Sequence, residues 1–124
     1  MVYFSYAELG AAEAPEAIRR NIERLCTHLL DPIREAVGRP ILVNSGYRSP
    51  EHNRRVRGSP TSDHLRGLAA DIRIAGLSGE ELKKLILPAI TQRRLSFDQL
   101  IVYPGFVHIS YRPGEENRGM VFRG

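Results

Sequence analysis

The sequence has no tryptophan, a single cysteine and no long apolar run, and the last two of these limit the class of protein. Cys26 cannot form a disulfide within the chain, and its helical neighbours predict a buried, apolar thiol. No stretch approaches the roughly 18 consecutive apolar residues of a membrane-spanning helix, so we expect no membrane span. The first residues also lack the basic-then-apolar order of a signal peptide, which leaves the location of the protein open.

Lysine is scarce as well, because only Lys83 and Lys84 among the 18 basic residues are lysines. The net charge of +4 favours anionic partners such as nucleic acid, a membrane surface or an acidic polymer of the cell wall. The densest basic cluster, residues 52–59, is short, and only 7% of the residues are aromatic. No nucleic-acid recognition motif accompanies the cluster, so we do not expect a nucleic-acid partner.

The length of 124 residues, with 42% hydrophobic and 26% charged residues, predicts a single globular domain over residues 1–124, which we expect to be a monomer. Apolar periodicity and turn residues predict helices over residues 15–37, 50–57 and 78–92, and strands over residues 41–45, 68–74, 97–103, 106–111 and 120–123. This order favours an α+β fold, in which helices pack on an antiparallel sheet.

Several residues define these elements more closely. The first helix carries an apolar stripe, which Pro32 interrupts or kinks, and Gly38 is a suitable end. Ser78 is a suitable cap for the helix over residues 78–92. That helix is expected to direct four residues inward: Leu82, Leu85, Ile86 and Ala89.

The stretch "SDHLRGLAAD" contains two potential metal ligands, His64 and Asp71. Side chains alternate along a strand, so Asp71 is expected to point away from the apolar face of residues 68–74. Small Ala69 leaves room beside it, and Gly67 permits a tight entry that could fold His64 back toward Asp71. This pattern predicts half of a metal site and requires a third ligand from elsewhere.

His108, in "FVHIS", is the candidate third ligand. Alternation places it on one face of its strand, where it could meet Asp71 across the sheet. Two imidazoles and a carboxylate form a typical catalytic zinc set that leaves a fourth position for water. Taken singly, His108 could instead be a core histidine with satisfied hydrogen bonds, and Asp71 a charge at a strand edge.

The stretch matches the pattern S-x-H-x-x-G-x-A-x-D at Ser62, His64, Gly67, Ala69 and Asp71. The upstream "SGYRSPEHNRRVRGSPTSDH", the downstream "FDQLIVYPGFVHISYRPGEENRG" and the opening "FSYAEL" fit the same family. Together they resemble the zinc D-Ala-D-Ala carboxypeptidases, a family of metallopeptidases that includes phage endolysins. The resemblance covers nearly the whole chain.

This resemblance implies the hedgehog/DD-peptidase fold, with Zn²⁺ as cofactor and His64, Asp71 and His108 as its ligands. The implied substrate is peptidoglycan, cut within its stem peptides or cross-links by carboxypeptidase or endopeptidase activity. Arg48 fits the substrate arginine of the family, whose planar guanidinium can hold a carboxylate or an oxyanion. A surface salt bridge is the alternative for Arg48, and Ser62 could either bind substrate or only cap its loop.

Many members of that family carry a glutamate or a histidine shortly before the last zinc ligand, as the general base. Here "QLIVYPGFVH" has neither before His108, and Tyr103 stands five positions before that histidine. Tyrosine ordinarily has a pKa near 10 and is a poor base at neutral pH, although its hydroxyl can donate to an oxyanion. Two hypotheses follow: a zinc peptidase in which Tyr103 and one of His52, Asp63 or Glu115 assist, or a non-catalytic zinc-containing module that binds cell wall or protein.

Overall fold

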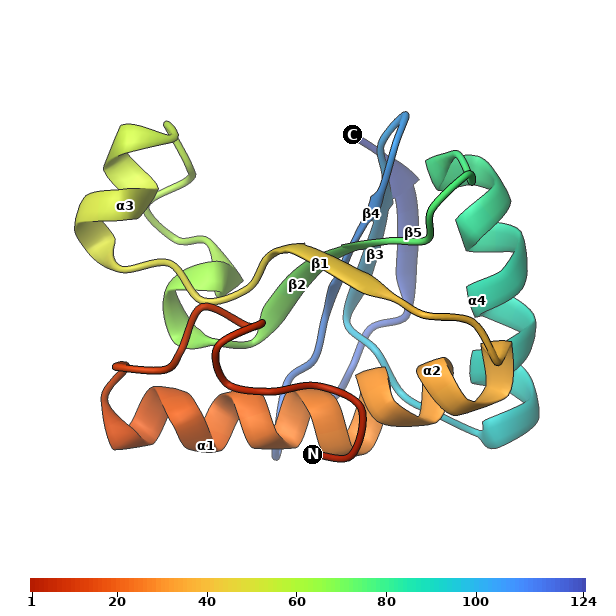
Figure 1. Cartoon of the computed structure of the whole chain (residues 1–124), viewed down its shortest axis with the longest axis horizontal. Coiled ribbons are helices and arrows are strands. Elements are labelled where there is room, and N and C mark those ends of the chain that lie inside the picture. The colour runs from red at the N-terminus through yellow and green to blue at the C-terminus, as the bar shows by residue number, and fades with distance from the viewer.

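The computed structural model describes residues 1–124, and its elements follow the predicted order (Figure 1). The helical elements are α1 (Glu16–Leu25), a π-helical turn (Cys26–Leu30), α2 (Asp31–Val37), α3 (Pro50–Arg55), a 3₁₀ turn (Asp63–Arg66) and α4 (Gly79–Arg93). The strands are β1 (Leu42–Ser45), β2 (Ala69–Arg73), β3 (Gln99–Val102), β4 (Val107–Ser110) and β5 (Met120–Arg123). None of the helices is both long and apolar enough to cross a membrane.

The five strands form one sheet in the order β1-β2-β4-β3-β5, which confirms the α+β class. The pairs β1–β2, β2–β4 and β4–β3 are antiparallel, as predicted, whereas β5 pairs with β3 in parallel. The parallel pair follows from the connection, because β4 ends beside the start of β3. The loop over residues 111–119 passes that end of the sheet, so β5 enters along the free edge of β3 in the same direction.

The long first helix forms as predicted, but it changes its winding before Pro32. The backbone N–H of Asp31 donates to the carbonyl of Cys26, five residues earlier, and this bond closes the π-helical turn. A proline has no N–H to donate and its ring crowds the preceding turn, so a wider turn at this point accommodates it. Cys26 is fully buried in this turn, and burial raises the pKa of its thiol to about 12.

Ser78 caps α4 as predicted, and the structure adds a capping box, since Ser78 and Glu81 exchange hydrogen bonds between side chain and backbone. Its inward face was predicted with one error. Leu82, Ile86 and Ala89 are buried, whereas Leu85 is 38% exposed. Residues three, four and seven positions apart on a helix lie only within about 100° of one another around its axis. In α4 the buried side of the helix includes Ile90 and leaves out Leu85.

The two faces of the sheet have different roles. Ala70, Ile72 and Ile109 belong to the apolar core that the long first helix and α4 cover. On the opposite face, Asp71 lies directly beside His108 in the register of β2 and β4. In Figure 1, α3 stands at one end of the molecule and α4 at the other. The sheet therefore separates the core from a polar face near α3.

The contact between α4 and the β3–β4 hairpin leaves no room for a side chain at Gly79, and we predict that Gly79→Ala destabilises the protein. A Cβ atom there would lie 1.8 Å from the carbonyl oxygen of Tyr103 and 2.6 Å from that of Phe106. We expect a loss of about 1–3 kcal/mol in the free energy of unfolding, measured by urea denaturation. Gly105→Ala is the control, because a Cβ there meets nothing within 4 Å, and it should change stability by less than about 0.5 kcal/mol. Equal stability of both variants would contradict the prediction.

Candidate metal centre

His64 is positioned by the 3₁₀ turn between α3 and β2. The side chain of Ser62 caps this turn by accepting a hydrogen bond from the backbone N–H of His64 at 3.2 Å. The carbonyl of His64 accepts from the backbone N–H of Arg48 at 3.0 Å, which ties the turn to the segment after β1. Gly67 ends the turn with a φ of 70°, a left-handed conformation that glycine adopts without strain. The His64 ring is consequently buried, with 3% exposure.

Asp71 and His108 are brought together by strand register. Asp71 on β2 is directly opposite His108 on β4, and on its other side it pairs with Ser45 of β1. A bulge between Val43 and Ser45 sets this second pairing. The alternation read from the sequence therefore places both side chains on the face of the sheet that is opposite the core.

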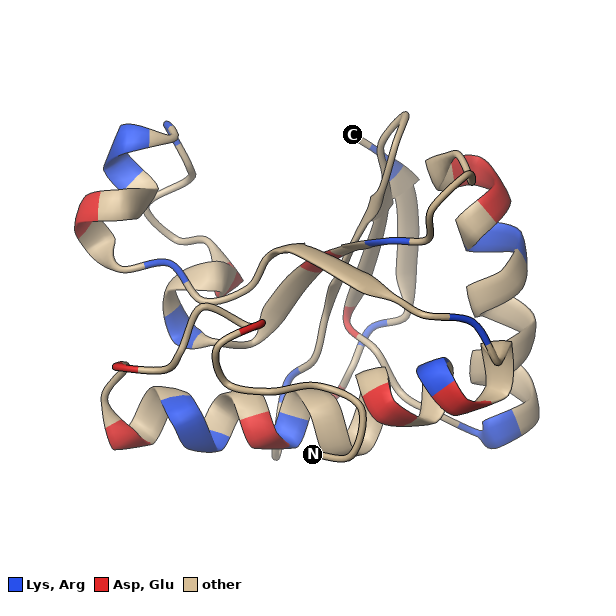
Figure 2. Cartoon of the chain, in the orientation of Figure 1, with Lys and Arg blue, Asp and Glu red and all other residues tan.

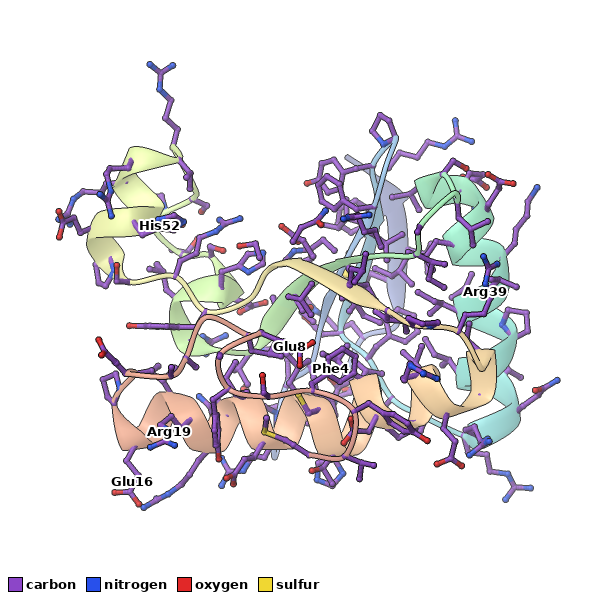
Figure 3. The ribbon with its side chains drawn as sticks, viewed as in Figure 1. Phe4, Glu8, Glu16, Arg19, Arg39 and His52 are labelled. Atoms are coloured by element: carbon purple, nitrogen blue, oxygen red, sulfur yellow. The ribbon has the colours of Figure 1, made fainter.

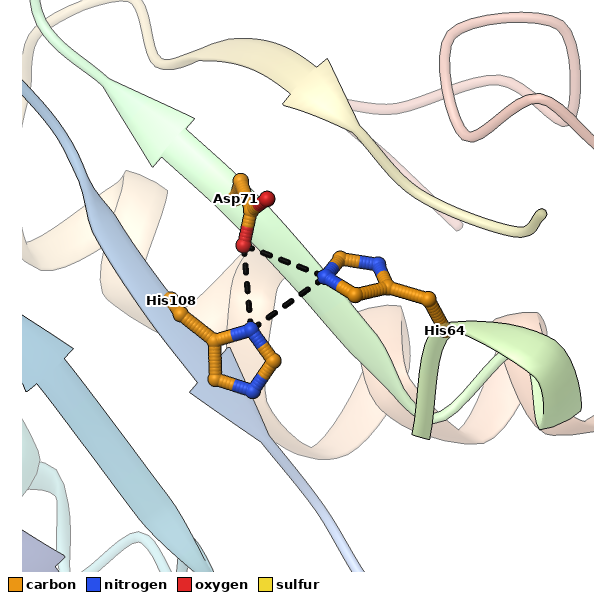
Figure 4. Close-up of side chains that lie close together, drawn as sticks. All are labelled: His64, Asp71 and His108. Carbon is orange, nitrogen blue, oxygen red and sulfur yellow. Dashed lines mark hydrogen bonds and ion pairs between the residues drawn. The ribbon is translucent and has the colours of Figure 1, made fainter. Parts of the chain in front are cut away.

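Three ligand atoms converge at this point (Figure 4). The Nε2 atom of His64 lies 3.2 Å from Oδ1 of Asp71, and Nδ1 of His108 lies 3.0 Å from the same oxygen. The two ring nitrogens are 3.2 Å apart. The other nitrogen of His64, Nδ1, lies 2.7 Å from the carbonyl oxygen of Gly46.

This arrangement suits a metal ion. Because the Gly46 carbonyl can only accept, it fixes the proton of neutral His64 on Nδ1 and leaves a lone pair on Nε2. That lone pair faces a carboxylate oxygen and the second imidazole, an arrangement that a cation among the three atoms would stabilise. Ligands of tetrahedral zinc, at about 2.0–2.1 Å from the ion, lie roughly 3.3 Å from one another, close to the separations in this cluster. The residues present could therefore hold one divalent ion.

The Asp71 carboxyl remains ionised in this setting. Its burial opposes ionisation, but the neighbouring imidazoles of His108 and His64 outweigh that effect and lower its pKa to about 2. The group is therefore a carboxylate throughout the neutral range, which is the form that binds a metal.

Arg48 lies beside the same carboxylate. Its Nη2 atom is 3.5 Å from Oδ2 of Asp71, on the oxygen that the imidazoles do not contact. Its Nε atom donates to the hydroxyl of Ser45 at 3.1 Å, and Nη1 donates to the side-chain oxygen of Asn53 at 3.3 Å. The side chain is 16% exposed, so this is a nearly buried guanidinium held in place by three groups rather than a surface salt bridge.

The cluster lies in a cleft of about 630 Å³. Its lining includes all three potential ligands and Arg48, together with Ser62, Asp63, Gln99, Tyr103, Phe106 and Arg118. The rings of Tyr103 and Phe106 stack at 4.7 Å and form an aromatic wall. The hydroxyl of Ser62, which also lines the cleft, caps the 3₁₀ turn by accepting the backbone N–H of His64.

Other candidates from the sequence lie elsewhere. His52 stands exposed on α3 (Figure 3), and neither it nor Glu115 lines the cleft. Glu115 pairs with Arg112 at 3.3 Å. His28 stacks on Tyr111 at 5.6 Å, away from the cluster. Besides Asp71, Asp63 is therefore the single carboxylate among the residues that line the cleft.

Three contributors to the site were not identified from the sequence. The Gly46 carbonyl orients His64, buried Asn53 holds Arg48, and Arg118 reaches the cleft from the loop before β5. A backbone carbonyl has no residue-type signal, so Gly46 could not have been found. Asn53 had a weak signal, because it is the one polar uncharged residue within the basic stretch "HNRRVR".

The fold and the cluster of two histidines and an aspartate in a cleft are those of a metallopeptidase. The family model of peptidase M15 matches residues 2–110, and the chain belongs to that family. The match includes all three potential ligands, Arg48, Ser62 and Tyr103, and it agrees with the hedgehog/DD-peptidase fold that the resemblance implies. A comparison with curated proteins found no significant match.

We predict that the chain binds one zinc ion and that His64→Ala or Asp71→Ala abolishes this binding, since each removes one of three ligands. Elemental analysis after equilibration with zinc should find one equivalent in the unsubstituted chain and much less in either variant. A chelator should also lower the melting temperature of the unsubstituted chain but not that of the two ligand variants, because a metal that binds the native state stabilises it. His28→Ala is the control, as it removes a histidine outside the cluster, and full zinc content in His64→Ala would refute the assignment.

Proposed function

We propose that the protein is a zinc-dependent peptidase that hydrolyses peptide bonds of peptidoglycan stem peptides or cross-links, as a D,D-carboxypeptidase or endopeptidase. The observation that carries the proposal is the convergence of His64, Asp71 and His108 in the cleft of an M15 chain. The assignment of peptidoglycan rests on the resemblance to the D-Ala-D-Ala carboxypeptidases. The net charge of +4 agrees with an anionic cell-wall substrate.

In this proposal His64, Asp71 and His108 hold the zinc ion. Zinc bound by three protein ligands acts as a Lewis acid on a carbonyl and makes water acidic enough to react near neutral pH. The Gly46 carbonyl and the guanidinium of Arg48 keep His64 and Asp71 in their binding orientations. The chain thus contributes a fixed set of ligands and an open cleft beside it.

Arg48 is proposed to bind the substrate. Its guanidinium is oriented by Ser45 and Asn53 and lies next to the ligand Asp71. A planar guanidinium can hold a terminal carboxylate, or the oxygen on which negative charge develops, through two hydrogen bonds. Its location at the metal cluster supports either contact.

The proton acceptor is the least conventional part of the proposed mechanism. Tyr103 stands where many family members have a general base, and its hydroxyl can donate a hydrogen bond to a developing oxyanion but is a weak acceptor of protons. Asp63 is the remaining cleft-lining carboxylate, and its Oδ1 atom lies 2.6 Å from Nη2 of Arg66. We therefore propose Asp63 as the acceptor and Tyr103 as the donor to the oxyanion.

The absence of a glutamate or histidine at the position of Tyr103 also supports a second candidate function: a zinc-containing module that binds cell wall or protein without cutting it. Incubation of the purified chain with purified peptidoglycan separates the two functions. A peptidase releases peptides or D-alanine, and a chelator stops the release. Binding to peptidoglycan without any release would support the module instead.

For Arg48 we predict that Arg48→Lys is nearly as damaging as Arg48→Ala, because lysine cannot make the two parallel hydrogen bonds of a guanidinium. Loss of such a contact typically costs about 3 kcal/mol of transition-state stabilisation, or roughly a hundredfold in kcat/KM. Steady-state kinetics on a stem-peptide substrate would measure this loss of kcat/KM. Arg55→Ala, at an exposed position of α3 outside the cleft, is the matched control. Unchanged kcat/KM in both Arg48 variants would reject the role.

For Tyr103 we predict that Tyr103→Phe slows turnover about ten- to a hundredfold, or roughly 1.4–2.7 kcal/mol, while the zinc content stays the same. The variant keeps the ring that stacks on Phe106 and removes only the hydroxyl. Tyr111→Phe serves as control, since its ring stacks on His28 outside the cleft. If the protein is a non-catalytic module, no rate exists to be lost, and Tyr103→Glu could then create one. An active enzyme whose rate is unaffected by Tyr103→Phe would disprove the proposed hydrogen bond.

A further inference from the structure

Arg118 brings a second guanidinium into the cleft that contains the three potential metal ligands. It lies on the loop between β4 and β5, yet it lines the same cleft as Arg48 and the three potential ligands. The family model matches residues 2–110, so Arg118 lies beyond the matched segment. The charged segments of the chain are shown in Figure 2.

The guanidinium of Arg118 is held by Asp98, the residue before β3. Its Nε atom donates to Oδ1 at 2.9 Å and Nη2 donates to Oδ2 at 2.8 Å, so the two planar groups meet through two hydrogen bonds. The backbone N–H of Arg118 also donates to Oδ1 at 3.1 Å. Asp98 is 1% exposed, and the hydrogen bond from Arg118 lowers the pKa of its carboxyl. A buried, ionised partner therefore fixes the direction of the guanidinium.

The loop that carries Arg118 is closed by its own side chains. Asn117 accepts from the backbone N–H of Arg112 at 2.8 Å and donates to the carbonyl of the same residue at 3.1 Å. Gly119, which follows Arg118, has a φ of 63° and donates its N–H to the carbonyl of Phe97 at 2.9 Å. Arg118 is thus presented from a fixed turn, which reduces the entropy lost when it binds a ligand.

The ion pair with Asp98 leaves some donors of the Arg118 guanidinium unused. A guanidinium has five N–H donors, and Asp98 takes only two of those of Arg118. The Arg118 side chain is 48% exposed and lines the cleft, so it can offer further donors to a ligand bound there. Asp98 also has a second cationic neighbour, because Nη1 of Arg112 lies 3.9 Å from its Oδ1 atom, and Arg112 does not line the cleft.

We propose that Arg118 binds a second carboxylate of the substrate, so that the cleft selects peptides with an internal carboxylate in addition to the group bound by Arg48. The inference rests on the proposed function and specifies its substrate class as an acidic peptide. A stem peptide offers this chemistry in two places: the free α-carboxylate of a γ-linked glutamate, or the extra carboxylate of a diaminopimelate in place of lysine.

Two pairs of synthetic stem peptides test the proposal and distinguish these sources. In the first pair, L-Ala-γ-D-Glu-L-Lys-D-Ala-D-Ala is compared with the same peptide whose glutamate α-carboxylate is an amide. In the second, lysine is replaced by diaminopimelate. Initial rates on the zinc-loaded chain give kcat/KM for each peptide, and calorimetric titration of the same zinc-loaded chain gives Kd where no turnover occurs.

The unsubstituted chain should prefer the peptide with the additional carboxylate about tenfold in at least one pair, as expected for one charge-assisted hydrogen bond. Arg118→Gln should abolish this preference, and Arg118→Lys should keep part of it. Arg112→Gln is the matched control: it also removes a cation beside Asp98, so both Gln variants are expected to lower the melting temperature, but only Arg118→Gln should remove the preference.

Three results would overturn the inference. Equal kcat/KM or Kd within both pairs for the unsubstituted chain would show that no second carboxylate is read. A preference that survives in Arg118→Gln, or that disappears equally in Arg112→Gln, would show that Arg118 does not read it. Wherever turnover is measured in these cases, the proposed hydrolysis still stands. If the chain neither cleaves nor binds any of the peptides, the inference is rejected together with the proposed function.

Discussion

The carboxylate of Asp71 is the group on which the architecture of the site depends. Its Oδ1 atom faces His64 and His108, and its Oδ2 atom faces Arg48. One side chain therefore links the other two potential metal ligands to the candidate substrate arginine. Its neighbours across the sheet are His108 on one side and Ser45 on the other, and Ser45 in turn holds Arg48. A shift of β2 by one residue would move Asp71 to the core face and disperse all of these contacts.

Small residues and backbone groups give this arrangement its precision. Gly46 accepts the ring N–H of His64 through its carbonyl, and a Cβ atom at Gly46 would lie 2.4 Å from the backbone oxygen of Leu9. The same N-terminal segment is tied to the first helix, since Asp31 accepts the backbone N–H groups of Val2 and Tyr3. The orientation of His64 therefore depends on close packing that extends to the N-terminal residues.

The cleft combines the potential metal ligands with an aromatic wall and two arginines. The M15 match includes all three potential ligands and Tyr103, whose ring stacks on Phe106. Arginines enter from two directions, Arg48 from the segment after β1 and Arg118 from the loop before β5. Each is oriented by polar partners that are themselves buried, Asn53 and Asp98. Such preorganisation lowers the entropic cost of binding an anionic ligand.

The sequence by itself determined the order of the elements, the Ser78 cap of α4, the buried thiol of Cys26 and the face on which Asp71 and His108 lie. These features follow from local periodicity, cap chemistry and strand alternation, which short stretches of sequence encode. Only the tertiary structure decided that β5 runs parallel to β3, that Leu85 is partly exposed, and that the Gly46 carbonyl and Arg118 contribute to the site. Those outcomes depend on contacts between residues far apart in the chain, and a backbone carbonyl or a loop arginine has no local signal of its eventual partner.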